Sequence, residues 1–94
     1  MLSKAPIPAK DRKLTRSELA QAIRYALIAE LDAINLYIQI AEGADDENVR
    51  KVFLDIAKEE KTHLGEFLAL LKTLDEEQVE ELKKGEEEVK ELTT

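Results

Sequence analysis

Hydrophobic residues recur along most of this chain at spacings of three and four, with polar residues between them. Such spacing places the hydrophobic side chains on one face of an α-helix. The pattern predicts helices over about residues 17–42 and 47–72, and a shorter, glutamate-rich helix over about residues 76–91. The predicted fold class is therefore all-α, with an antiparallel two-helix hairpin followed by a short C-terminal helix.

Residues with strong local preferences mark the ends of these helices. Residues 15–18 (TRSE) have the form of a capping box, which starts the first helix. Gly43 is a suitable C-terminal stop for it. Asp45 or Asp46 caps the second helix, and Asp75 caps the third. The turn between the first two helices is short, so these helices are expected to be antiparallel neighbours.

The chain divides into an N-terminal arm and one helical domain. Residues 1–14 contain two prolines and read as an extended arm, whereas residues 15–92 form the helical domain. The arm also carries a basic cluster of Lys10, Arg12 and Lys13. A chain of 94 residues has room for one small domain.

Glu30 lies at the centre of the apolar stripe of the first helix. A lone carboxylate at such a position is costly, and the stripe contains no lysine or arginine to pair with it. The apolar side chains within about 40° of it on a helical wheel are Leu19, Ile23, Ala26, Ile34, Tyr37 and Ala41.

Glu60 lies at the centre of the apolar stripe of the second helix. His63, the single histidine of the chain, lies on the same face one turn further along. The apolar side chains within about 40° of Glu60 are Val49, Phe53, Ile56, Leu64, Phe67 and Leu71. The exposed glutamates Glu59 and Glu66 fit a solvated face instead.

The hairpin brings these groups to one height. Glu30 lies 12 residues before Glu42, and Glu60 lies 13 residues after Glu47. At the helical rise per residue, the two carboxylates lie within about 2–5 Å of each other along the axis. A lone Glu-x-x-His is common, and a lone histidine is more often a core or edge residue than a ligand. Two facing stripes with matched carboxylates favour a metal site.

This ligand set is half of a known arrangement. Two-metal carboxylate sites in helix bundles use a glutamate from each of two helices and a Glu-x-x-His unit from each of the other two. The chain supplies one of each, so a two-fold partner would complete the set. The absence of cysteine excludes a thiolate site.

Charge and hydropathy narrow the possible partners. A net charge of -7 argues against nucleic acid and favours attraction of cations. No run approaches the roughly 20 apolar residues of a membrane span, and residues 1–13 show no signal peptide. We therefore expect a cytoplasmic protein without a membrane partner.

The segments IAELDAINLY (residues 28–37) and EEKTHLGEF (residues 59–67) resemble those of the encapsulated ferritins, short ferritin-like proteins that work inside encapsulin shells. The resemblance covers about residues 15–92. It implies that Glu30, Glu60 and His63 are ferroxidase ligands, with Glu60 bridging two irons and the other two as terminal ligands.

The resemblance also implies an assembly. Two chains would form a ferritin-like four-helix bundle with two irons per dimer, and dimers would form a decameric ring inside the nanocompartment. Asp32 matches a position linked to metal entry in the family. Leu36 stands where some relatives carry an aromatic residue. The chain ends without a targeting tail, so we expect either a lost tail or natural fusion to a shell protein.

Several alternatives stay open from the sequence. Mn, Co, Zn or Ca could substitute for iron at such ligands. Tyr37 is either a hydrogen-bond donor to a ligand carboxylate or a core residue. The favoured activity is Fe(II) oxidation with O2 or peroxide. The other candidates are a rubrerythrin-like peroxidase and a non-catalytic helical assembly that a metal staples together.

The first helix is also apolar on a second side. Tyr25, Ile28 and Leu36 lie more than about 110° from Glu30. They would pack against the third helix of the same chain or form a second interface between dimers, and we favour a mixture of both. The residues available on the third helix are Val79, Leu82 and Val89.

Overall fold

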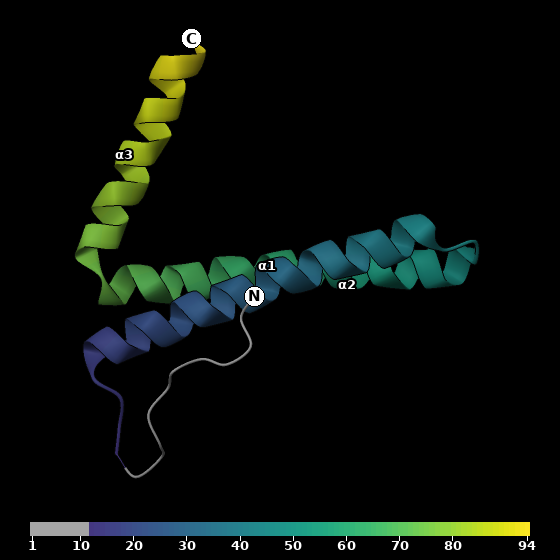
Figure 1. Cartoon of the computed structure of the whole chain (residues 1–94), viewed down its shortest axis with the longest axis horizontal. Helices are drawn as coiled ribbons and strands as arrows, with labels where there is room; N and C mark the ends of the chain where they lie inside the picture. The colour runs from purple at the N-terminus through teal and green to yellow at the C-terminus, as the bar shows by residue number, and fades with distance from the viewer. Residues whose placement is uncertain (1–11) are drawn as a thin grey trace.

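The computed structural model describes residues 12–94, and this part of the chain is helical without any strand. Its elements are α1 (Arg16–Gly43), α2 (Glu47–Leu74) and α3 (Glu76–Thr93). α1 and α2 lie side by side as an antiparallel hairpin, and α3 leaves the far end of α2 and projects away (Figure 1). The predicted all-α hairpin with a third helix is confirmed.

A reciprocal cap starts α1. The Thr15 hydroxyl accepts a hydrogen bond from the Glu18 backbone N–H at 3.2 Å, and the Thr15 N–H donates to the Glu18 carboxylate at 2.9 Å. Arg12 donates two further bonds to that carboxylate, at 2.7 and 2.8 Å. Residues 12–14 of the predicted arm are non-helical, while its residues 1–11 lie outside the described part of the chain.

The turn between α1 and α2 spans residues 44–46. α1 ends at Gly43 with a negative φ, so the stop does not use the left-handed conformation that glycine allows. Instead Ala44 is extended, and its N–H donates to the Ala41 carbonyl at 3.3 Å. Asp46 caps α2 by accepting from the backbone N–H groups of Asn48 and Val49. A turn this short forces the two helices to run back along each other.

The core is a thin seam between α1 and α2. Three of its five residues are alanines, and small side chains let two helices approach closely. Because the hairpin is a single layer, each helix is covered on one side only. The buried residues are Ala20, Ile34, Ala41, Ala57 and Leu71.

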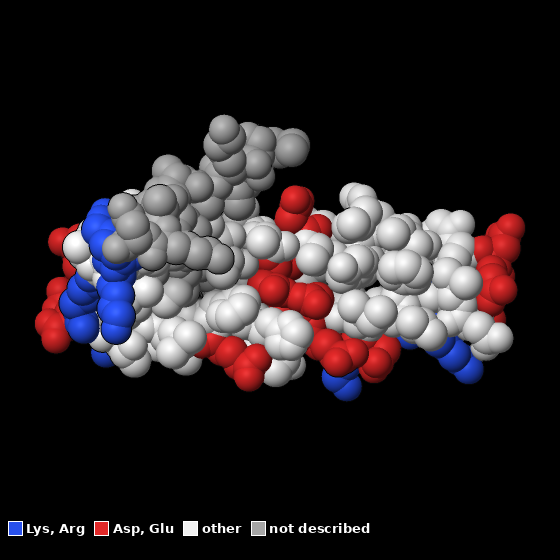
Figure 2. All heavy atoms as spheres, turned by 90° about the horizontal axis from the view of Figure 1, so that it is seen from below, with Lys and Arg blue, Asp and Glu red and all other residues white. Residues whose placement is uncertain are grey.

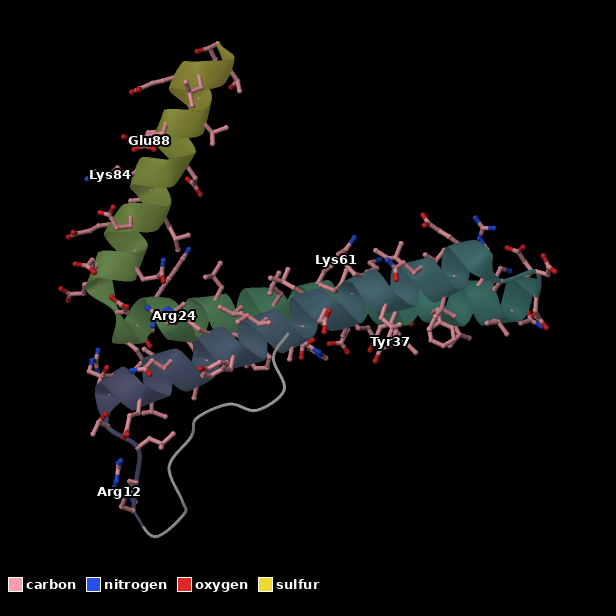
Figure 3. All side chains as sticks on the ribbon, in the orientation of Figure 1. Arg12, Arg24, Tyr37, Lys61, Lys84 and Glu88 are labelled. Carbon is pink, nitrogen blue, oxygen red and sulfur yellow. The ribbon has the colours of Figure 1, made fainter. Side chains whose placement is uncertain are left out.

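A single residue, Asp75, separates α2 from α3. Its carboxylate caps α3 by accepting from the Gln78 N–H at 3.0 Å, and it also binds the guanidinium of Arg24 on α1. Arg24 reaches the side chain of Gln78 as well, at 3.2 Å (Figure 3). The backbone bond from Gln78 and then the Arg24 contact hold the pKa of Asp75 below its ordinary value. These contacts set the direction in which α3 leaves the hairpin.

α3 does not cover the second apolar side of α1. Ile28 is 46% exposed and Leu36 is 52% exposed, and α3 contains no buried residue. Packing of these side chains against the third helix of the same chain was a wrong expectation, because the Asp75 bend directs α3 away from α1. Tyr25 is half-buried. No helix in residues 12–94 is both long and apolar enough to cross a bilayer.

The α1 cap should make stability depend on acidic pH. Hydrogen bonds from Arg12, then from the Thr15 N–H, lower the pKa of Glu18 from 4.5 to about 2. A lowered folded-state pKa means that the stabilisation is fully present above pH 4.5 and is lost as pH falls towards 2. We expect Glu18→Gln to lower the melting temperature at pH 7, and this difference to shrink towards pH 2.

Circular dichroism melts of metal-free protein at fixed concentration measure the difference. Glu87→Gln on the exposed surface of α3 removes the same charge without a cap and serves as the control. An equal gap between parent and Glu18→Gln at both pH values would show that the ionised carboxylate does not stabilise the cap.

Candidate metal centre

Three potential metal ligands meet at the middle of the hairpin. Glu30 comes from α1, and Glu60 and His63 come from successive turns of α2. One ligand atom from each lies within 4.8 Å of the others. The structure thus brings together the three ligands that the sequence pattern indicated.

Local geometry explains why they meet. Residues three apart on a helix share a face, so Glu60 and His63 point to the same side of α2. The short turn sets Glu30 opposite them on the neighbouring helix. The His63 Nδ1 atom lies 3.4 Å from a carboxylate oxygen of Glu60 and 3.9 Å from one of Glu30. The imidazole is therefore aimed between the two carboxylates.

The carboxylates are poorly compensated within their own chain. Their side chains are only 19% exposed, against 47% for His63. One oxygen of Glu30, Oε2, is buried without any hydrogen-bond partner. In residues 12–94, His63 is the sole ion-pair partner of either carboxylate. A buried acceptor without a partner is unfavourable, and a cation among these ligands would satisfy it.

The cluster opens onto one broad side of the hairpin, which we term the site face. Acidic side chains lie near the middle of this side, and mainly uncharged residues surround them (Figure 2). On a helical wheel, large apolar side chains lie within about 80° of Glu30 or Glu60. These side chains remain 37–56% exposed. They are Leu19, Ile40, Val49, Val52 and Leu70.

Tyr37 lies on the site face, on the opposite side of the hairpin from Lys61 (Figure 3). Its ring packs against Phe53 of α2, with centroids 5.8 Å apart and planes tilted by 49°. Tyr37 is seven residues from Glu30, about 10 Å along the helix. Its contact within the chain is this aromatic pair, which pattern analysis of single helices did not indicate.

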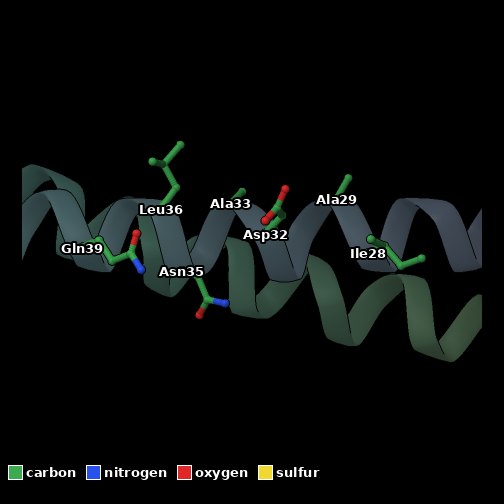
Figure 4. A pocket seen from close by; sticks show the side chains of 7 residues that line it. All are labelled: Ile28, Ala29, Asp32, Ala33, Asn35, Leu36 and Gln39. Atoms are coloured by element: carbon green, nitrogen blue, oxygen red, sulfur yellow. The ribbon is translucent and has the colours of Figure 1, made fainter. Parts of the chain in front are cut away.

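Asp32 lies away from the three ligands. It is exposed and lines a shallow hollow on the outer side of α1 (Figure 4). Polar amides and the apolar side chains of Ile28 and Leu36 line the same hollow. Asp32 is therefore not part of the ligand cluster.

Comparison with known proteins gives consistent relatives. The rubrerythrin family matches residues 21–94. A "Ferritin-like-encapsulin shell fusion protein" from Pyrococcus furiosus is 63% identical over 84 residues, which are 89% of this chain and 24% of that protein. An "Encapsulin nanocompartment cargo protein EncC" from Myxococcus xanthus is 37% identical over 83 residues, covering 88% of this chain and 64% of that protein.

A solved structure is also similar. The crystal structure of an encapsulated ferritin domain from Pyrococcus furiosus superposes with a TM-score of 0.89 at 60% identity. The match covers 99% of this chain and 96% of that one. The chain therefore spans nearly all of that domain, but less than two thirds of each of the two full-length relatives.

Metal binding should stabilise the protein and enlarge its assemblies. Ligands that bind only the folded state stabilise it by about 2.7 kcal/mol at a hundred times their Kd. We expect anaerobic Fe(II) to raise the melting temperature and the mean mass in size-exclusion chromatography with light scattering. Glu60→Gln should lose most of both responses.

Glu88→Gln provides the matched control, since it removes the same charge from the exposed surface of α3. It should respond to Fe(II) as the parent does. Identical elution and melting of the parent with and without Fe(II) would contradict a metal site at these residues.

Proposed function

Because the chain belongs to the rubrerythrin family as an encapsulated ferritin domain, we propose that it is a ferroxidase that oxidises Fe(II) at a site shared by two copies. The observation that carries this proposal is the incomplete ligand cluster. One copy offers two carboxylates and one imidazole, and Glu30 keeps a buried oxygen atom without a partner. A second copy would add the same three ligands.

The site face supports a homodimer. Its exposed leucine, isoleucine and valine side chains surround the ligands, and burying them against a second copy is favourable by roughly 25 cal/mol per Å² of apolar surface. Closing this face would also shield the carboxylates from water. The outcome is a four-helix bundle, with two helices from each copy around the metal centre.

The ligand set fits iron. Carboxylate oxygens and imidazole nitrogen suit Fe(II), with Mn, Co, Zn and Ca as competitors. Four carboxylates per dimer offset the charge that rises as iron is oxidised. Family resemblance assigns the bridging position to Glu60 and the terminal positions to Glu30 and His63. In the O2-dependent reaction, two Fe(II) give two electrons to O2, which takes up two protons and leaves as hydrogen peroxide.

The natural setting follows from the relatives. One is a fusion of a ferritin-like part with an encapsulin shell, and another is an encapsulin cargo protein. We therefore assign this domain to the inside of an encapsulin nanocompartment in the cytoplasm, where Fe(III) would pass to a mineral store. The exposed hollow containing Ile28 and Leu36 is available for contacts between dimers in a ring, which the family resemblance implies to be a decamer.

Two alternatives use the same ligands differently. A rubrerythrin-like peroxidase needs an electron donor, and this chain has no cysteine from which to build a rubredoxin-type iron site. In the second alternative, a metal ion would link the copies in an assembly and would not be oxidised. Stopped-flow oxidation of Fe(II) separates the ferroxidase from this assembly, because only a ferroxidase oxidises Fe(II) faster than buffer without protein does.

The ligands should differ in their effect on the rate. We expect Glu60→Ala to lower the rate of Fe(II) oxidation by about 100-fold or more, since it removes a bridge to both metals. Glu30→Ala and His63→Ala each remove one terminal ligand per iron and should leave a slow residual rate. Tyr37→Phe should cost at most about 10-fold.

Absorbance of Fe(III) after rapid mixing measures these rates, and folding of each variant is checked by circular dichroism. Glu88→Gln, on the exposed surface of α3, is a charge-matched control. Parental oxidation by Glu60→Ala would refute the assignment of the site.

Storage should depend on a shell. A two-helix domain that dimerises through one face does not enclose a large cavity, so we expect it to oxidise iron but to keep little of it soluble. Aerobic Fe(II) loading followed by sedimentation should give early precipitation. A soluble product that holds hundreds of irons per oligomer would contradict this expectation.

A further inference from the structure

The aromatic residues of this chain are few and unevenly placed. It contains two tyrosines and two phenylalanines. Three of these, Tyr37, Phe53 and Phe67, share the wheel sector of the ligands on their helices and are half-buried. Their spacing is regular, because Phe53 precedes Glu60 by seven residues and Phe67 follows it by seven.

These aromatics lie at two levels on either side of the metal centre. Seven residues of helix are about 10 Å long. Tyr37 and Phe53 share one level, as their ring contact of 5.8 Å requires. Phe67 lies about 10 Å beyond the ligands in the opposite direction. In residues 12–94, no other aromatic ring pairs with Phe67.

Two copies can bring their site faces together around a two-fold axis in two ways. An axis parallel to the helices sets like ends of the hairpins together, whereas an axis across the helices sets opposite ends together. At the turn end, every charged side chain over residues 42–47 is acidic, and the basic Arg50 and Lys51 follow one turn along α2. The acidic residues are Glu42, Asp45, Asp46 and Glu47. The other end of the hairpin carries basic and acidic side chains in similar number and is therefore less acidic than the turn end. The basic residues are Arg12, Lys13, Arg16 and Lys72, and the acidic ones are Glu18, Asp75, Glu76 and Glu77.

Charge favours the axis across the helices. Figure 2 shows basic side chains beside acidic ones at one end of the molecule, and mainly acidic side chains at the other. Opposite ends would then meet, and charges of opposite sign attract across an interface whereas like charges repel. Rotation about this axis inverts the direction of the hairpin. A residue between the ligands and the turn in one copy therefore faces a residue between the ligands and the opposite end in the other copy.

We infer that the Tyr37–Phe53 pair of one copy packs against Phe67 of the partner subunit. Symmetry then builds two such clusters, one at each end of the metal centre, which we term aromatic collars. This inference rests on the proposed function, in which two copies share the site. It goes further by naming the residues that cover the site and the relative orientation of the two copies.

The collars have a physical role at this position. An aromatic side chain buries about 150–250 Å² and loses little conformational entropy, so it is a common anchor of interfaces. A collar on each side of the four carboxylates would exclude water along the seam. In the drier site, the attraction between carboxylates and a bound cation is stronger.

Chemical cross-linking tests the collar directly, since the natural chain has no cysteine. Phe53→Cys and Phe67→Cys are combined in one chain, loaded with Co(II) and treated with a bis-maleimide whose reach is well below 20 Å. The two thiols within one chain are about 20 Å apart along α2, too far to link. We expect covalent dimers from the double variant, and only traces from either single variant.

The outcomes are distinct. Efficient linking of either single variant would mean that like ends meet, which overturns the inference. Absence of links in a double variant that still forms Co(II)-loaded dimers would also overturn it. Because the parent protein is assayed for Fe(II) oxidation in parallel, the collar can fail while the proposed ferroxidase stands. A parent protein that neither forms dimers nor oxidises Fe(II) would contradict the proposed function itself.

A second measurement leaves both rings in place, in case the cysteine variants fold poorly. Incorporation of 4-fluorophenylalanine gives two fluorine signals, because the chain has two phenylalanines. Phe67→Leu assigns them by removing one. A fluorine–fluorine Overhauser effect between the two signals in the metal-loaded dimer is expected, since a separation of about 20 Å within one chain would give none. Its absence in a confirmed dimer would count against the collar.

Discussion

The structure depends on two carboxylates that a thin hairpin holds together with no lysine or arginine of residues 12–94 paired to them. Glu30 and Glu60 are each four-fifths covered, and only a half-exposed histidine accompanies them. Isolated buried charge is among the most costly features a fold can carry. In the proposed function, a metal ion would remove that cost and a second copy would supply the remaining ligands. The same constraint therefore links folding, metal binding and assembly.

The exposed apolar side chains follow from the same constraint. A single layer of two helices buries a seam of small residues and leaves each helix open on its other sides. On the site face, those open sides carry leucine, isoleucine and valine around the ligands. Such a surface is incomplete as a monomer and suited to self-association. The chain belongs to the rubrerythrin family, and this geometry supports the proposal that one copy holds only half of the site.

Much of this could be predicted from the sequence, because helical periodicity and capping are local. The pattern placed Glu30 and Glu60 on facing stripes, and the short turn gave them equal heights. The direction of α3 could not be predicted, because it depends on Arg24 of α1 meeting Asp75 across the fold. Nor could the pattern separate the residues that fill the hairpin seam from those that stay exposed, since both lie on one continuous stripe.

The proposed function requires one metal centre that two chains share, and native mass spectrometry of the iron-loaded protein measures this sharing. We expect iron on species with an even number of chains, at two irons for each pair, and no two-iron site on released monomers. A monomer that retains two irons on its own would contradict it.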